Sequence, residues 1–200
     1  MQNDLLDYQL YVKEIIAHKR PVINDIINKI QSVVDEVNPN FKVNLYGSYA
    51  TGLCLPWSDI DVVLVNKGEH KNEDIYLLRN VFIKLSTKSW ITSHKYIENT
   101  SIPIIKLVFN DTFSFHVDIS IETEKHFGLK CVQLVKSFQA DYEVLEPIVL
   151  ALKTLLNNGN LKLAFSKYIN EDSKVISERN IIDRLNTLLP NLVYDEPYLV

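Results

Sequence analysis

Three aspartates and a Gly-Ser pair are the residues of this sequence whose types and spacing could do chemistry. Ten residues separate the Gly47-Ser48 pair from Asp59, and a single isoleucine separates Asp59 from Asp61. A third aspartate, Asp118, interrupts a later apolar stretch. Carboxylates held close together repel each other, and Mg²⁺ is typically bound by one or two carboxylates together with substrate phosphates. The combination indicates metal-dependent chemistry on a phosphate compound.

The first two aspartates begin a run that ends in four successive aliphatic residues, which favours a buried strand from Asp59 to Val65. Side chains at positions i and i+2 of a strand project to the same face, about 7 Å apart. Asp59 and Asp61 are therefore expected to point the same way from a central strand. The alternative is a surface turn in which Asp59 caps a neighbouring residue and Asp61 is solvated.

Asp118 lies in the run Phe115–Ile121, where it alternates with apolar residues. If His116, Asp118 and Ser120 share one face of a strand, that face is polar and could lie beside the first two aspartates. The alternative is an ordinary amphipathic edge strand with His116 and Ser120 in water.

The Gly-Ser pair precedes a stretch, Tyr49–Gly52, that can start a short helix. Exposed amides and the Ser48 hydroxyl would suit a phosphate, and Gly47 would let the backbone approach a ligand closely. The alternative is a helix cap made by Ser48, with Gly47 relieving a turn. Together with three carboxylates that hold two metal ions, such a phosphate site could align a nucleoside triphosphate with an attacking hydroxyl.

The elements that must position these residues belong to an α+β fold, a mixed β-sheet flanked by helices. Apolar residues recur at helical spacing from Leu5 to about Val37, and Pro21 is expected to break this segment into two helices. The remaining pattern predicts strands at 41–46, 59–65, 90–96, 102–109 and 113–121, the last two as a hairpin, and helices at 72–86, 129–138, 145–157 and 174–189.

The composition and charge of the chain argue against several classes of protein. The 200 residues carry a net charge of −4 with no basic run longer than a dipeptide, which argues against a stand-alone, high-affinity nucleic-acid binder. The N-terminal residues do not resemble a signal peptide, and the most apolar late stretch, PIVLALKTLL, is too short to span a membrane. We expect an intracellular protein, nuclear or cytoplasmic, that is not secreted and has no membrane contact.

The motifs "FKVNLYGSYATGLCLPWSDIDVVLV", "IPIIKLVF" and "FHVDISIE" resemble the polymerase-β-like nucleotidyltransferase superfamily. Within it they are similar to the noncanonical poly(A) polymerases of the TRAMP type and to terminal uridylyltransferases, from about Leu5 to Phe165. This resemblance implies a nucleotidyltransferase palm with N-terminal helices at residues 1–125. Residues 126–200 would then form a helical region, a reduced or divergent form of the family's central domain.

The resemblance also implies roles for single residues. Asp59, Asp61 and Asp118 would be the catalytic residues and would bind two Mg²⁺ (or Mn²⁺) ions. Gly47 and Ser48 would hold the triphosphate of ATP or another NTP.

Three later residues have weaker counterparts in the family. Lys153 would face the triphosphate from its helix, and the alternative is a solvated helix lysine. Ser166 and Tyr168 could be what is left of the family's nucleotide-binding segment, which has a glycine pair that this chain lacks. The alternative for Tyr168 is loop surface.

The expected function is that of a metal-dependent nucleotidyltransferase, which adds nucleotides from an NTP to an RNA 3′ end. The nucleotide expected to be added is AMP. Because the chain is acidic, a basic RNA-binding partner would have to deliver the RNA, and the chain would work in a complex. One alternative is a catalytically weak or inactive subunit that acts as a scaffold in an RNA-processing complex. Another is a minimal nucleotidyltransferase that modifies a protein or a small molecule.

Overall fold

A five-stranded mixed sheet forms the centre of the computed structural model, which describes residues 2–68, 75–109 and 114–157. The strand order is β1-β2-β5-β4-β3; β2 and β5 are parallel, and the other pairs are antiparallel. The strands are β1 (Phe41–Leu45), β2 (Ile60–Asn66), β3 (Ile91–Ile97), β4 (Ile104–Phe109) and β5 (His116–Ile121). This sheet confirms the predicted α+β class and the β4–β5 hairpin.

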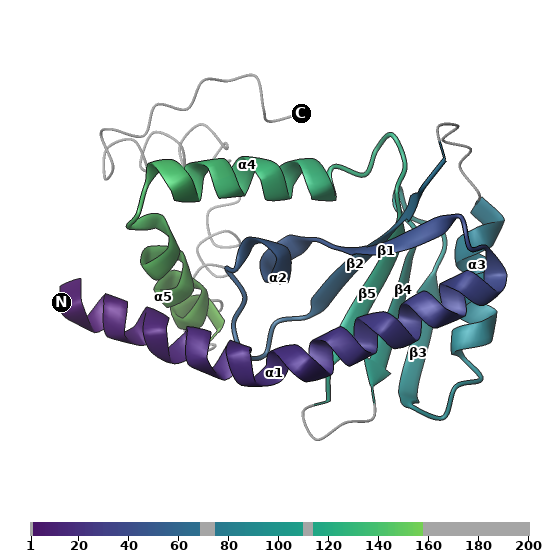
Figure 1. The fold of residues 1–200 in the computed structure, drawn as a ribbon, viewed down its shortest axis with the longest axis horizontal. Helices are drawn as coiled ribbons and strands as arrows, with labels where there is room; N and C mark the ends of the chain where they lie inside the picture. The colour runs from purple at the N-terminus through teal and green to yellow at the C-terminus, as the bar shows by residue number, and fades with distance from the viewer. Residues whose placement is uncertain (1, 69–74, 110–113, 158–200) are drawn as a thin grey trace, which may run out of the picture. The chain divides into compact units, whose positions relative to one another are not determined.

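The helices are α1 (Gln2–Val37), α2 (Gly47–Thr51), α3 (Ile75–Leu85), α4 (Gly128–Asp141) and α5 (Leu145–Asn157). Helices α1 and α3 cover one face of the sheet (Figure 1), and their apolar side chains join the main core with alternate residues of the strands. Strand residues of that core include Ile60, Val62 and Leu64 of β2. Because side chains alternate along a strand, the residues between them face the opposite side of the sheet.

The predicted break at Pro21 is wrong, because α1 continues through this residue as one helix. Pro21 lies on the exposed side of α1. Apolar side chains are buried on both sides of it: Val12 packs against Leu55 and Leu150, and Ile23 belongs to the main core. Tertiary packing along both halves of the helix outweighs the one backbone hydrogen bond that a proline removes.

The predicted strand from Asp59 to Val65 forms one residue later, so Asp59 lies in the loop immediately before β2. A tight turn precedes Asp59, and two hydrogen bonds between Leu55 and Ser58 close it. The Leu55 amide donates to Ser58 Oγ, and the Ser58 amide donates to the Leu55 carbonyl. The chain becomes extended only after this turn, and Asp59 is exposed at its end.

Residues 1–153 form one compact unit, separate from the residues that follow. The expected division of the chain at residues 125 and 126 stays a prediction. The predicted helix at 174–189 lies outside the described residues. Among the helices that the structure describes, none is long and apolar enough to cross a membrane.

Candidate active site

The parallel pairing of β2 with β5 places two of the three predicted aspartates side by side. Asp61 is the direct partner of Asp118 in the register of these strands. Paired residues of neighbouring strands share a face, with backbones about 4.8 Å apart. Both side chains are partly buried, on the face of the sheet opposite α1 and α3. Asp61 is therefore not a solvated turn residue.

The three carboxylates act on one another electrostatically. The pKa of Asp61 is raised to about 6, first by burial and then by the negative charges of Asp118 and Asp59. Asp59 contributes this charge from the exposed loop before β2. The site thus concentrates negative charge around the half-buried Asp61 carboxyl group, and nearby lysines compensate that charge only in part.

A lysine that sequence reasoning missed neutralises Asp118. Lys106 of β4 is the antiparallel partner of Asp118, and its Nζ lies 2.6 Å from Asp118 Oδ2. The hydrogen bond to Asp118 is the main cause that raises the pKa of Lys106. The signal was present, since Lys106 is the one polar residue in the strand IIKLVF. Only the hairpin register shows which residue it faces.

Gly47 begins α2 with its backbone directly against the Asp61 carboxylate. Its φ is +64°, and a β-carbon at this position would overlap the Asp61 side chain. Both features favour glycine. The N-cap of α2 is Tyr46, with no side-chain cap hydrogen bond, so Ser48 lies in the first turn and not at the capping position.

Lys153 reaches the same region from α5. Its Nζ donates a hydrogen bond of 2.7 Å to the carbonyl of Leu53, in the loop between α2 and β2. Desolvation lowers the pKa of Lys153, while the negative charge of Asp61 acts in the opposite direction. Lys153 is therefore a partly buried, anchored cation near Asp61 and not a freely solvated helix lysine.

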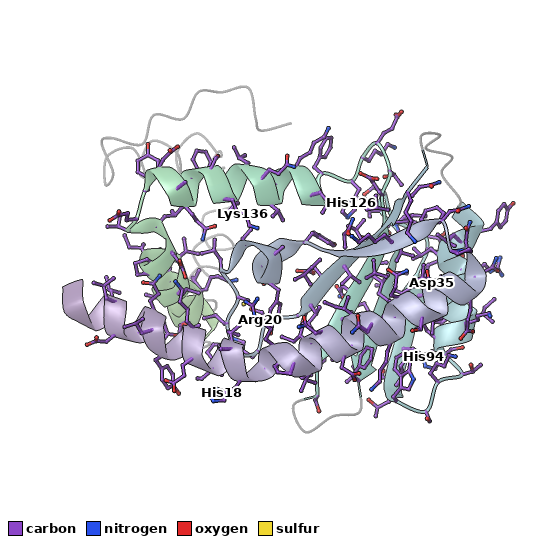
Figure 2. All side chains as sticks on the ribbon, viewed as in Figure 1. His18, Arg20, Asp35, His94, His126 and Lys136 are labelled. Atoms are coloured by element: carbon purple, nitrogen blue, oxygen red, sulfur yellow. The ribbon has the colours of Figure 1, made fainter. Side chains whose placement is uncertain are left out.

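Behind the aspartates lies a buried polar contact that sequence reasoning also missed. Ser120 is fully buried, and its Oγ lies 2.9 Å from Nε2 of His126, which itself stands edge-on to the Tyr46 ring. Figure 2 shows His126 in the link just before α4. The alternative with Ser120 in water is therefore wrong, although His116 is exposed. This contact joins the strand of Asp118 to the start of α4.

Two predicted nucleotide-binding residues, Ser166 and Tyr168, lie outside the described residues. Within residues 2–68, 75–109 and 114–157, no three His, Cys, Asp or Glu side chains form a ready-made metal site. The pair Asp61 and Asp118 nevertheless fits Mg²⁺, which needs only one or two carboxylates when substrate phosphates supply further oxygens. The uncompensated negative charge on Asp61 supports the same fit.

A sheet of this topology, with paired carboxylates on β2 and β5 and a glycine turn against them, has the fold of a nucleotidyltransferase palm. The family described as poly(A) RNA polymerase, mitochondrial-like, central palm domain matches residues 11–140. The chain belongs to this family. The finding confirms the resemblance to the noncanonical poly(A) polymerases.

Individual relatives agree with this assignment. The chain is 27% identical over 169 residues to poly(A) RNA polymerase protein 2 of Saccharomyces cerevisiae, covering 80% of this chain and 28% of that protein. It is 29% identical over 165 residues to poly(A) RNA polymerase cid14 of Schizosaccharomyces pombe, covering 81% and 23%. The chain thus spans about a quarter of the length of these curated relatives.

Solved structures show the same fold. The noncanonical poly(A) polymerase complex GLD-2–GLD-3 superimposes with a TM-score of 0.63 at 19% identity, covering 77% of this chain and 49% of that chain. The Cid1 poly(U) polymerase superimposes with a TM-score of 0.59 at 20% identity, covering 78% and 46%.

The close approach of Gly47 to Asp61 can be tested with a matched pair of substitutions. Gly47 and Gly52 both have positive φ, but a β-carbon on Gly52 meets no other atom within 4 Å. Gly52→Ala should lower the free energy of unfolding by about 1 kcal/mol, the cost of a left-handed alanine. Gly47→Ala should lower it by about 2 kcal/mol or more, because the new methyl group also displaces the Asp61 carboxylate. Equal losses in urea denaturation would show that Gly47 is not tightly packed against Asp61.

The raised pKa of Asp61 predicts a pH-dependent effect of Asp61→Asn on the metal-free protein. The folded state holds the Asp61 proton more tightly than the unfolded state, so ionisation destabilises the fold as pH rises from about 4 through about 6. In EDTA at pH 7.5, Asp61→Asn should raise the melting temperature, on the order of 2 °C. The difference should shrink towards pH 4, where the wild-type carboxyl is protonated. A less stable variant at pH 7.5 would contradict this electrostatic description.

Proposed function

We propose that this chain is the catalytic palm of a metal-dependent RNA nucleotidyltransferase, which adds nucleotides from an NTP to an RNA 3′ end. The register that pairs Asp61 with Asp118 carries the proposal, because it presents two carboxylates together on the face of the sheet opposite α1 and α3. Family membership and the names of the relatives support an RNA substrate, and the poly(A) relatives favour ATP as the nucleotide.

Each residue of the site has a part in this proposal. Asp59, Asp61 and Asp118 would hold two Mg²⁺ or Mn²⁺ ions, which activate the attacking hydroxyl and neutralise the leaving pyrophosphate when bound. Asp118 is also the proposed acceptor of the 3′-hydroxyl proton. In the metal-free protein its Oδ2 is held by Lys106.

The nucleotide would lie between the carboxylates and the segments beside them. Gly47 brings the backbone against Asp61, so a phosphate held at Gly47 and Ser48 would lie next to the metal ligands. Lys153 supplies a positive charge near Asp61 while its Nζ is anchored at the Leu53 carbonyl. We extend the same role to Ser166 and Tyr168 as proposed contacts to the nucleotide.

RNA would be delivered by a partner. The net charge of −4 gives the chain little attraction for a polyanion, so we propose a basic RNA-binding protein as a subunit of the active complex. Two of the similar solved structures are themselves complexes, GLD-2 with GLD-3 and GLD-2 with RNP-8. A scaffold without catalysis is less favoured, because the aspartates are kept in a charged cluster that destabilises the metal-free fold.

A primer-extension assay tests the proposal. A 5′-labelled RNA oligonucleotide is incubated with ATP or UTP and Mg²⁺, and extended products are separated on a gel. We expect extension that Asp118→Asn reduces by about 100-fold or more, because this carboxylate serves both the metal and the proton. His116→Asn is the matched control, since His116 lies exposed on the same strand. Extension that Asp118→Asn leaves unchanged would overturn the proposal.

A further inference from the structure

A row of charged side chains crosses the face of the sheet opposite α1 and α3. The registers pair Lys95 with Lys106, Lys106 with Asp118, and Asp118 with Asp61, on strands β3, β4, β5 and β2. Direct partners in neighbouring strands share a face, so all four side chains belong to one side of the sheet. The side chains of Lys95 and Lys106 therefore lie between the β3 edge of the sheet and the two carboxylates.

The two carboxylates of this row differ in their compensation. Asp118 has a lysine nitrogen 2.6 Å from Oδ2, and its side chain is only 17% exposed. Asp61 has no ion pair within the part of the chain that the structure describes, and its negative charge faces Asp118 at the neighbouring position. In the metal-free protein one carboxylate is thus neutralised and the other is not.

Lys106 is placed so that it can leave Asp118. Its side chain is 47% exposed, and it approaches the carboxylate from the side of the sheet edge. An ammonium group on a flexible stem that leaves a carboxylate can be solvated by water at little cost. A divalent ion bound at Asp118 would meet the positive charge of Lys106 unless that charge moved away.

We propose that Lys106 is a positioning residue that occupies Asp118 in the metal-free protein and competes with the divalent cation for this carboxylate. Lys106 then holds the Asp118 side chain in place before metal arrives and weakens cation binding, because metal entry requires the ion pair to break. The inference rests on the proposed function, which assigns Asp118 as a metal ligand.

The test measures Mn²⁺ binding to the full chain without nucleotide, by calorimetry at constant ionic strength. Lys106→Gln should bind Mn²⁺ at least about fivefold more tightly than the wild type, since a competing cation is removed and the net negative charge of the site increases. Lys106→Arg should stay within about twofold of the wild type, because it keeps the charge. Lys95→Gln should also stay within about twofold, because Lys95 lies one strand further from Asp118.

The outcomes separate this inference from the proposed function. Equal or weaker Mn²⁺ binding by Lys106→Gln, with wild-type binding that Asp118→Asn abolishes, would overturn the inference and leave the metal assignment in place. No Mn²⁺ binding by either the wild type or Lys106→Gln would contradict the inference, and the primer-extension assay would then decide the proposed function separately. A purely structural role would appear as a lower melting temperature of Lys106→Gln without tighter Mn²⁺ binding. If Lys106→Gln does not fold, Lys106→Met keeps the alkyl stem and carries the same expectation.

Discussion

The parallel pairing of β2 with β5 is the constraint on which the candidate site depends. Each strand alternates apolar side chains, which enter the core under α1 and α3, with side chains that face the other way. Burial of Ile60 and Val62 therefore fixes the direction of Asp61, and burial of Val117 and Ile119 fixes that of Asp118. A shift of one residue in either strand would turn its carboxylate into the core. Hydrophobic packing therefore fixes the register that the site requires.

The charged side chains around these two carboxylates determine the electrostatics of the site. Lys106 compensates Asp118, Lys153 lies near Asp61 from α5, and Asp59 adds further negative charge from the loop before β2. The resulting cluster raises the pKa of Asp61 and disfavours the ionised, metal-free protein. Bound cations would relieve this repulsion, in agreement with the metal ions that we propose for the site.

Sequence reasoning found the parts of this site that depend on local pattern. The apolar run after Asp59, the hairpin of β4 and β5 and the glycine turn at Gly47 all follow from alternation and residue type. It failed where contacts between segments far apart in the sequence determine the structure. Contacts on both sides of Pro21 keep α1 continuous, and only strand register pairs Lys106 with Asp118. The buried contact of Ser120 with His126 joins residues only six apart, but it depends on how the link between β5 and α4 folds.

The central claim is that Asp61 and Asp118 together bind the metal ions of a nucleoside triphosphate. Calorimetric titration of ATP into the wild type, with Mg²⁺ and again with EDTA, tests it most directly when Asp61→Asn/Asp118→Asn is measured alongside. We expect ATP binding that requires Mg²⁺ and that the double variant loses. ATP binding of the same strength in EDTA, or in the double variant, would show that the nucleotide is held elsewhere and would contradict the assignment of the paired carboxylates.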